Sequence, residues 1–547
     1  MQGEYRGDFS RDTFHRTNHF CRVLMQQGRV QLDADWNEQT SILLHFMRAL
    51  GRDLIGQHGG PAPAPGFAVG PITGLGGDFQ IGAGNYYVDG ILCELGPEVI
   101  PVTLNDGGAL QVSLAALDGL IFQKDQYLEV FDPSDSTNSS VVKISTVDTT
   151  GTVLTVSGLT ISNLPDLMAR RVITYLTQPD LRNPDPVDKT FTTLLVYLDV
   201  WERHLTSLGN NLIREVALGG PDTASRAKVL SQVRLTAKQP NSDTPIPAKE
   251  PNVGWRPWVD AVWPQWRSGW QGSNRGLLKA QVQMQPDSAD PCVISPESNY
   301  RGEENQLYRV EIHNGGSVAT TAGSSSPSLK WSRENGSIAF PILKLEKSAG
   351  QTTVTLADLG RDSSLSLKND DWVEVVDDDS VLSGSVDLLL QVQDIDYVNR
   401  VVTLTGESGI IVDQPPTRHP ILRRWDGTGP ISESNGNLPT DWIALEDGIQ
   451  IQFQPQPTAL LGAMYRSGDY WLIPARVATG DIEWPKLRDQ NGKLVLDDSD
   501  NPIPDVLPPH GIEHHYAPLA IVSLKGGTVT GVTDLRRTFG PLGQPIP

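Results

Sequence analysis

Apolar and polar residues alternate along short runs over most of this chain, a pattern typical of β-strands that bury one face. The clearest runs are Phe79–Leu95, Leu194–Val200, Val229–Leu235, Leu278–Met284, Gly448–Phe453, Tyr470–Ile473 and Ala517–Leu524. In the first of them a Gly-Ala-Gly turn and a Val-Asp-Gly turn predict a hairpin. The pattern predicts a mainly β fold, a multi-module β body of sandwiches or small barrels.

Two segments far apart in the chain resemble each other. Asp125–Asp132 reads DQYLEVFD, and Asp370–Asp377 reads DDWVEVVD. Each precedes a second pair of strand-like runs, which end at Gly158 and Gly406. An aromatic residue, alternating apolar residues, a turn and a Val/Leu/Thr strand suit a small barrel or a curled sheet. The repeat therefore predicts two copies of one small β module.

One stretch near the N-terminus has helical spacing instead. Gly56 ends the helix predicted for Asn37–Ile55. The apolar residues on one face of this helix are Ile42, Leu43, Phe46, Met47, Leu50 and Leu54. Asp33 or Asp35 is expected to cap this helix, with Trp36 packed under its first turn. The run GGPAPAPG, residues 59–66, predicts a linker between this N-terminal arm and the body.

The apolar face of the predicted helix needs a covering surface, because an isolated helix of this length is marginal in water. A partner protein and the body of the chain are both open as that surface. The arm also carries seven Arg residues and no Lys up to Gln57, which favours bidentate pairing in an interface. The residues expected to carry docking are Arg11, Phe14, Arg22, Arg29, Asp33, Asp35, Trp36 and Asn37.

These patterns divide the chain of 547 residues into six regions. The first three are a helical docking arm (residues 1–58), a hairpin region (67–120) and the first β module (121–165). The last three are a central β body with a Trp-rich loop at residues 255–270 (166–336), the second β module (337–415) and a C-terminal β region (416–547).

Composition narrows the classes of function. A net charge of -21 argues against a nucleic-acid partner, which would need a basic stripe to displace counterions. Cys21, Cys93 and Cys292 are odd in number and widely spaced, which indicates a reducing compartment and no disulfide framework. The first residues lack an apolar leader segment, so we expect cytoplasmic synthesis and no transmembrane segment.

Five tryptophans form a candidate binding surface within sixteen residues: Trp255, Trp258, Trp263, Trp266 and Trp270. They could form a platform for a glycan or a partner protein. The same residues, interleaved with Pro257, Pro264 and Gly269, could instead pin an irregular loop to the body. This second interpretation is favoured because nothing in the spacing selects a flat platform.

His510, Glu513 and His514 spell the H-x-x-E-H signature of inverted zinc proteases. That mechanism requires a helix, which the flanking prolines and Gly511 oppose. A structural metal held by His510, His514 or His515 stays an alternative to a loop of hydrogen-bonded histidines. The calcium-loop likeness of Asp33–Glu38 fails because the sixth and twelfth positions are Glu38 and Leu44.

Several longer segments carry a resemblance to a known group of proteins. GDFSRDTFHRTNHFCRVLMQQGRVQLDADWNEQ (residues 7–39), LDVWERHLT (198–206), REVALGGPDTASR (214–226), NYRGEENQLYRVEIHNGG (299–316) and GDYWLIPAR (468–476) resemble a family of uncharacterised proteins found with phage-tail-like contractile injection systems. The hairpin region around Phe79–Leu95 also looks like an element of baseplate and tail-fibre proteins.

The resemblance implies a structural component of a contractile injection particle, associated with its baseplate or tail fibres, and a homo-oligomer because such particles are symmetric. Lysis could carry such a particle, and this protein with it, outside the cell. No nucleophile elbow, phosphate-binding loop or dinucleotide fingerprint is present, so we expect no enzyme and no cofactor. The alternative function is a carbohydrate-binding or glycan-processing tail protein that uses the Trp-rich segment on a glycan or cell-surface target.

Overall fold

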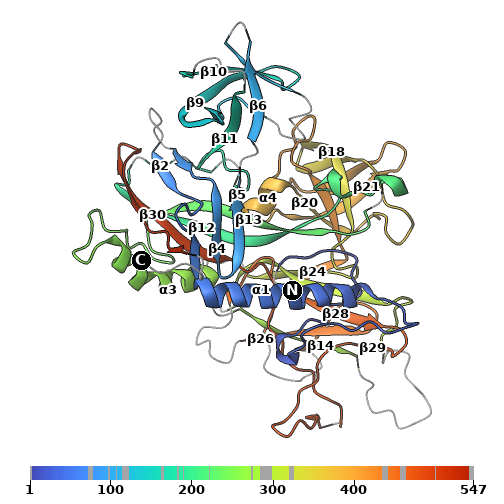
Figure 1. The fold of residues 1–547 in the computed structure, drawn as a ribbon. Coiled ribbons are helices and arrows are strands. Elements are labelled where there is room, and N and C mark those ends of the chain that lie inside the picture. The colour runs from blue at the N-terminus through green and yellow to red at the C-terminus, as the bar shows by residue number, and fades with distance from the viewer. Residues whose placement is uncertain are drawn as a thin grey trace, which may run out of the picture. The chain divides into compact units, whose positions relative to one another are not determined.

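The computed structural model describes residues 3–71, 78–96, 99–105, 108–113, 122–161, 166–181, 184–185, 187–188, 190–220, 222–272, 275–283, 299–318, 326–433, 441–455, 464–498 and 500–540. The fold is mainly β, as the sequence predicted (Figure 1). The chain divides into two compact units. Unit 1 comprises residues 1–46, 201–229 and 271–513, and unit 2 comprises 47–200, 230–270 and 514–547.

Unit 1 contains two sheets that share one core. The five-stranded sheet has the order β24-β17-β15-β28-β29, and the three-stranded sheet has the order β14-β26-β25. Their bounds are β14 Leu277–Val282, β15 Gln306–Asn314, β17 Ser328–Ser332, β24 Gly427–Pro430, β25 Ile443–Ala444, β26 Ile449–Gln454, β28 Tyr470–Arg476 and β29 Asp481–Ile482. Alternate apolar residues of both sheets, such as Tyr308, Ile451 and Trp471, meet in this core. Two further short strands pair with each other: β16 Gly316–Ser317, which follows β15 along the chain, and β27 Met464–Tyr465, which precedes β28.

Unit 1 also contains a closed six-stranded barrel with the order β18-β19-β22-β21-β20-β23, called barrel 2 here. Its strands are β18 Ala339–Ser348, β19 Gln351–Leu356, β20 Trp372–Val376, β21 Leu389–Asp396, β22 Val401–Thr405 and β23 Ile421–Trp425. Helix α4, Asp378–Ser383, begins with a capping box made by Asp377 and Ser380. The remaining short turns are η1 Arg16–Asn18, η2 Asn211–Ile213 and η3 Val216–Leu218.

Unit 2 is built on a four-stranded sheet with the order β13-β12-β30-β31. Its strands are β12 Thr193–Leu205, β13 Arg226–Thr236, β30 His515–Lys525 and β31 Thr528–Asp534, and helix α3, Trp255–Gln271, packs on it. A second sheet has the order β32-β1-β4-β5, with β1 His58–Pro61, β4 Gly84–Val88, β5 Ile91–Leu95 and β32 Thr538–Phe539. The predicted hairpin is confirmed as β4 and β5, joined at Asp89 and Gly90, both with positive φ.

A second six-stranded barrel, barrel 1, lies in unit 2. It closes in the order β6-β7-β10-β9-β8-β11, because β11 pairs with both β6 and β8. The strands are β6 Val99–Leu104, β7 Leu110–Val112, β8 Tyr127–Asp132, β9 Asp135–Val147, β10 Val153–Ser157 and β11 Met168–Thr174, and β2 Val69–Pro71 and β3 Phe79–Ile81 extend the sheet from β11. When the six strands of each barrel are counted along the chain, both barrels have the same order around the barrel: first, second, fifth, fourth, third and sixth. The two repeat segments therefore have the same small β fold.

The predicted linker is wrong. His58–Pro61 forms β1, which pairs with β4 and with β32 and is buried at its first three residues. A Cβ at Gly66 would approach the Gly84 carbonyl oxygen to 2.3 Å, so this glycine permits close packing of two backbone segments. The Gly and Pro residues of this run serve tight packing rather than flexibility.

Candidate functional site

The first residues of the arm form a strap that is seated on unit 1. The Tyr5 hydroxyl donates to Glu202 (2.5 Å), and the Tyr470 hydroxyl donates to the Gly3 carbonyl (2.8 Å). Asn335 Nδ2 donates to the carbonyls of Tyr5 (3.3 Å) and Gly7 (2.9 Å). We call residues 3–14 the strap. These contacts favour the interpretation in which the body itself covers this part of the arm.

A buried charged cluster lies under the strap. Arg6 donates to Glu311 Oε1 (2.7 Å), Arg309 donates to Glu311 Oε2 (2.6 Å), and Lys330 bridges Glu311 (3.3 Å) and Glu374 (2.6 Å). Burial alone would raise the pKa of Glu311, but the three cations around it hold that pKa well below its usual range. The carboxylate is thus charged in the folded chain, and Arg6 of the strap is one of the groups that stabilise it.

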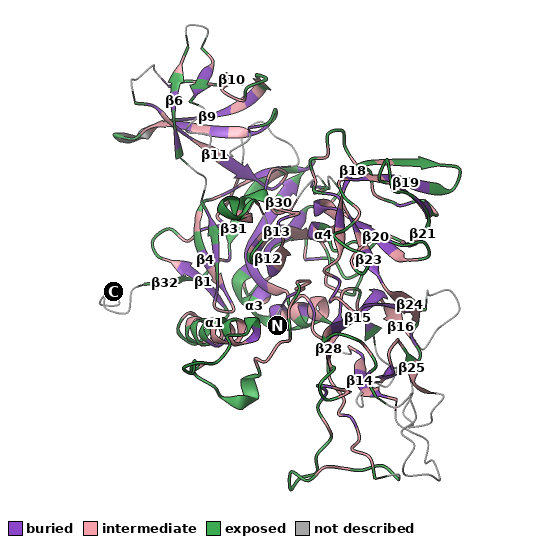
Figure 2. Cartoon of the chain, turned by 90° about the vertical axis from the view of Figure 1, so that its right-hand side faces the viewer, coloured by how far each residue is buried: buried purple, intermediate pink, exposed green. Residues whose placement is uncertain are grey.

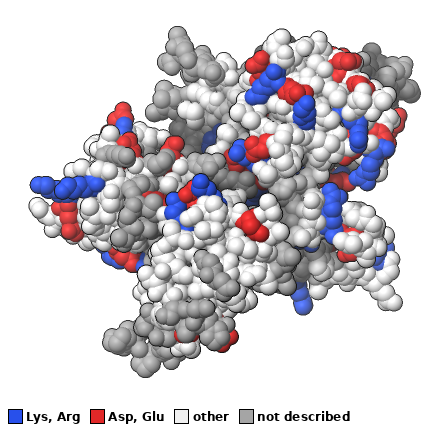
Figure 3. Space-filling view, turned by 90° about the horizontal axis from the view of Figure 1, so that it is seen from above, with Lys and Arg blue, Asp and Glu red and all other residues white. Residues whose placement is uncertain are grey.

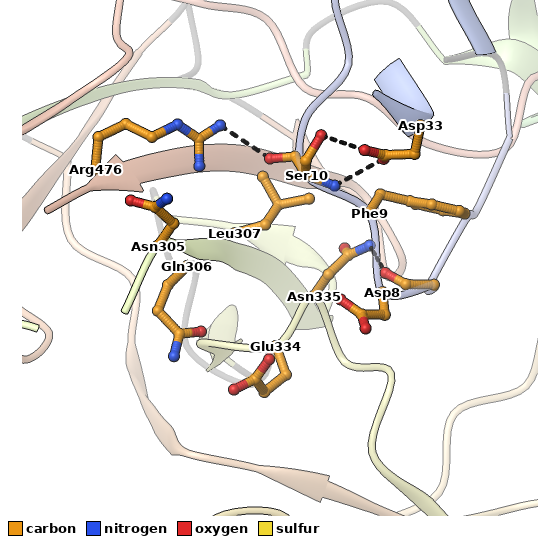
Figure 4. Close-up of a pocket in the computed structure, with 11 residues that line it drawn as sticks. Asp8, Phe9, Ser10, Asp33, Asn305, Gln306, Leu307, Glu334, Asn335 and Arg476 are labelled. Atoms are coloured by element: carbon orange, nitrogen blue, oxygen red, sulfur yellow. Dashed lines mark hydrogen bonds between the residues drawn. The ribbon is translucent and has the colours of Figure 1, made fainter. Parts of the chain in front are cut away.

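A pocket of about 390 Å³ opens beside the strap (Figure 4). Gly7–Ser10 form one wall, and the others come from the start of β15, from Glu334 and Asn335, and from Arg476. Arg476 donates to the Ser10 carbonyl (3.0 Å), which joins two of the walls. Burial, with a smaller contribution from Asp8, raises the pKa of Glu334. The pocket exists only with the strap seated, and no contact among the described residues assigns a ligand to it.

Helix α1, Asp33–Ile55, begins four residues earlier than predicted, and its 23 residues pass from unit 1 into unit 2. Within unit 1 the arm fixes it by hydrogen bonds from Ser10 to Asp33 (2.6 and 2.9 Å), from Thr13 to Glu38 (2.7 Å) and from the Val23 amide to Gln39 (2.8 Å). Within unit 2 a Cβ at Gly90 would meet the Arg48 carbonyl oxygen at 2.0 Å. The helix backbone therefore packs directly on the β4–β5 turn.

The large apolar residues of α1 face away from the protein. Only Ala34 and Ile42 are buried. Five apolar side chains repeat along the opposite side with these exposed fractions: Trp36 70%, Leu43 53%, Met47 68%, Leu50 61% and Leu54 59%. We call these five residues the α1 stripe; Leu44 and Phe46, 42% and 52% exposed, flank it. The sequence correctly predicted an apolar helix face, and the structure leaves most of that face uncovered.

The segment before the helix adds to this surface. Phe20, Leu24, Met25, Val30 and Leu32 are all exposed, and Figure 2 shows this segment in the colour of exposed residues. Twelve of the large apolar side chains that are exposed among the described residues thus fall between Phe20 and Leu54. A concentration of exposed large apolar side chains in one segment is typical of interaction sites in soluble proteins. Residues 20–54 are the candidate docking surface.

The predicted docking residues divide between the strap and this surface. Arg11 pairs with Glu483 (3.0 Å), the ring of Phe14 lies 5.9 Å from that of His45, and Asp35 accepts from the Leu32 amide (3.3 Å) at the helix start. Arg22 and Arg29 are exposed, and Asn37 is half-buried. The expectation that Trp36 packs under the first turn is wrong, because its ring is on the outer side of the helix.

The Trp-rich segment is helix α3, which corrects the predicted irregular loop. Trp255, Trp263 and Trp266 are buried with Val259 against Tyr197 and Ile521 of the sheet, and Trp258 and Trp270 are partly buried around them. Pro257 is tolerated because the amides of a helix's first turn need no helical partner. The anchoring interpretation agrees with this burial, since three of the five rings are not available to a glycan.

The histidines of the H-x-x-E-H segment do not lie on a helix. His510 forms a β-bridge with Tyr470 in unit 1, while His514 and His515 in unit 2 contact Asp199 (2.7 Å) and Asp89 (2.9 Å). Among the residues that the structure describes, no three His, Cys, Asp or Glu side chains form a group that could hold a metal ion. Cys21 is exposed and Cys93 buried, both as free thiols, and Cys292 lies outside the described residues.

The surface and the helices give two further observations. On the face seen in Figure 3, the Lys and Arg residues that the structure describes are interspersed with Asp and Glu. No helix within the described ranges combines the length and the apolar character that crossing a membrane requires.

In a comparison with known protein families, the chain matches a family of unknown function, DUF6519, over residues 5–100, 185–246 and 273–531. These residues make up more than half of the chain. The chain belongs to the DUF6519 family. The match includes the strap from Tyr5 onward, α1 and barrel 2, whereas nearly all of barrel 1 and the whole of α3 fall in its gaps. No curated protein and no solved structure matches the chain.

Proposed function

We propose that this protein is a non-enzymatic structural component of a protein assembly and that it attaches to the assembly through the candidate docking surface. The α1 stripe is the observation that carries the proposal. Its five large apolar side chains are exposed by more than half, although the helix that bears them is fixed by hydrogen bonds and by backbone packing.

Holding apolar side chains rigidly in water is unfavourable, and a covering partner recovers that free energy. Full burial of one such side chain is worth about 1.5–3 kcal/mol, so the exposed half of each contributes about 1 kcal/mol. Because the helix is already ordered, little conformational entropy is lost when a partner binds. The surface is thus suited to a stable protein contact.

The assembly that the resemblance supports is a phage-tail-like contractile injection particle, with this chain near the baseplate or the tail fibres. Segments at residues 7–39, 198–206, 214–226, 299–316 and 468–476 carry that resemblance. The burial of three Trp rings in α3 removes the feature on which a carbohydrate-binding function rested. No glycan function is therefore proposed for that segment.

Co-sedimentation with particles from a lysate tests the proposal. The double variant Leu43→Glu/Leu50→Glu should reduce incorporation at least tenfold, because two carboxylates would have to be buried at the contact. Its thermal unfolding should match that of the unchanged protein, since both positions are exposed.

The matched control is Val398→Glu in barrel 2, a position that is 90% exposed and far from the arm in sequence. It should be incorporated normally. Full incorporation of the stripe variant, or equal loss with the control, would contradict the docking role of α1.

A further inference from the structure

The spacing of the α1 stripe specifies the kind of partner. Trp36, Leu43 and Leu50 are seven residues apart, and Met47 and Leu54 repeat with Thr40 at the same interval. In coiled-coil terms the first three occupy d positions and the others occupy a positions. A narrow seam of this period fits the side of another α-helix better than a flat sheet or a pocket.

The seam is complementary to itself when two copies run in opposite directions. With a two-fold axis at the level of His45, residues an equal number of steps before and after it face each other across the contact. Trp36 then meets the partner's Leu54, and Leu43 meets the partner's Met47; the remaining layer joins Leu50 to the partner's Thr40. Every layer thus contains an a position facing a d position, as antiparallel pairing of two heptad seams requires.

The one polar member of the seam is compatible with burial. The Thr40 hydroxyl donates to the Trp36 carbonyl of its own helix (3.2 Å), so it needs no partner across the contact. Leu44 and Phe46 lie directly before and after His45, on opposite flanks of the seam. A two-fold axis keeps each flank on its own side, so Leu44 would meet Leu44 of the second copy and Phe46 would meet Phe46 of the second copy. The flanks therefore extend the apolar surface at its centre.

The acidic first turn and the helix dipole also favour this direction. The first turn of α1 carries Asp33 and Asp35, whereas the last turn carries Arg52 together with Asp53. Parallel pairing would set the acidic turns of two copies side by side and align the two helix dipoles. Antiparallel pairing places each acidic first turn beside the last turn of the partner.

The exposed residues of α1 are numerous enough for a contact between two copies. A stable interface takes about 800 Å² from each partner. The stripe and its flanks comprise seven large apolar side chains, each 42–70% exposed, and a second copy paired along α1 would cover all seven.

We infer that the α1 stripe binds the α1 stripe of a second copy of this chain, as an antiparallel helix pair centred at the level of His45. The inference rests on the proposed function, because it identifies the first partner of the docking surface. In a particle, this pair would be the unit that is incorporated, and the exposed apolar residues between Phe20 and Leu32 would be the part of the docking surface that contacts the neighbouring subunit.

Site-specific cross-linking of the full chain tests the register, in a Cys21→Ser/Cys292→Ser background that leaves only the buried Cys93 as a native thiol. A mixture of Leu43→Cys and Met47→Cys proteins should form an intermolecular disulfide under mild oxidation. A mixture of Leu43→Cys and Leu54→Cys is the control, since those positions would be about 10 Å apart along the axis at 1.5 Å per residue. The first mixture should cross-link at least tenfold more than the control.

Light scattering on the unchanged protein should show a mass that rises with concentration toward twice 59.7 kDa. Leu43→Glu should hold it at the monomer mass, and Leu43→Glu/Met47→Lys should restore the dimer, because each new Glu would face a new Lys of the other copy. Val398→Glu should leave the dimer unchanged.

A monomer at every concentration overturns the inference, and so does stronger cross-linking of Leu43→Cys with itself, which indicates parallel pairing. Loss of particle incorporation in a protein that is always monomeric overturns the helix pair and leaves the docking role intact. A cross-linked dimer whose disruption does not affect incorporation supports the pair and contradicts the docking role.

Discussion

Asp125 and Asp370 have the same backbone conformation at the same place in two barrels, each with φ of +72°. The amide of Asp125 donates to the Ile144 carbonyl (2.9 Å), and the amide of Asp370 donates to the Val392 carbonyl (2.8 Å). A reciprocal hydrogen bond joins the next residue of each barrel to the same strand. The Gln126 carbonyl accepts from the Ile144 amide (2.8 Å), and the Asp371 carbonyl accepts from the Val392 amide (2.9 Å). The likeness of the two barrels thus extends to the details of one turn.

This equivalence predicts equal responses to substitution. Asp125→Ala and Asp370→Ala should each destabilise their barrel by about 1 kcal/mol, because alanine tolerates positive φ less well than aspartate does. Asp→Gly at either position should cost less, because glycine adopts this conformation without strain. Thermal unfolding of the four single variants would test this, and a large cost in only one barrel would contradict the equivalence.

The strap should contribute to the stability of unit 1. Arg6→Met removes one of the three cations around buried Glu311, so we expect a loss of about 1–3 kcal/mol in the free energy of unfolding. The pKa of Glu311 should rise at the same time. Chemical denaturation with Arg22→Met as the control checks this, since Arg22 is exposed in the same arm. Equal effects of the two substitutions would show that the strap is not integrated.

Stability should fall in mild acid. Burial lowers the pKa of His58, His313 and His510 to about 4 and that of His204 to about 3. The unfolded chain, with histidine pKa values near 6.5, binds more protons than the folded chain below that pH. The free energy of unfolding should therefore decrease as the pH falls from about 6.5 to about 4, and Glu311 adds a further loss below about 4.5.

Melting temperatures between pH 7.5 and 4.5 measure this effect. His204→Asn should make the dependence shallower, because asparagine can still accept the bond from the Arg6 amide (3.3 Å) without gaining a proton. His19→Asn, at an exposed position, serves as the control. A melting temperature that stays constant over this range would contradict the neutral state of the buried histidines.

Two tryptophans should behave in opposite ways. Trp266→Ala empties a site in the core that is 1% exposed and should cost about 3–5 kcal/mol. Trp36→Ala should change stability by less than about 0.5 kcal/mol, because that ring is 70% exposed, yet it should weaken assembly. Unfolding and co-sedimentation of both variants separate the two roles. Strong destabilisation by Trp36→Ala would place this ring in the core.

Period-two alternation and the repeat were sufficient to predict the mainly β fold, the hairpin at Asp89 and the two similar modules. Helix α3 was missed because Pro264 lies inside it, although Trp255, Val259, Trp263 and Trp266 have helical spacing. Proline removes one hydrogen bond of the helix, and the burial of large rings offsets that loss.

The site was harder to predict, because two elements violate the rule that one face is apolar and buried. In β15, Arg309, Glu311 and His313 alternate with Tyr308, Val310 and Ile312, which by itself indicates a solvent face. Both sets are buried. The cost of burying the charged set is offset by charged partners from the strap and from other strands, such as Arg6 beside Glu311. In α1 the opposite holds, and the apolar residues stay exposed. Neither outcome can be read from local spacing, because each depends on which distant segment covers the face.

In each barrel the first and last strands are neighbours: Ile100 of β6 is level with Ala169 of β11, and Phe340 of β18 is level with Leu422 of β23. A domain whose ends emerge side by side can be spliced into a loop of a host without moving the host's own strands. Barrel 1, which falls almost entirely in a gap of the family match, has the connectivity of such a cassette. The position it occupies between β5 and β12 is accordingly a natural place to graft a foreign domain onto this scaffold.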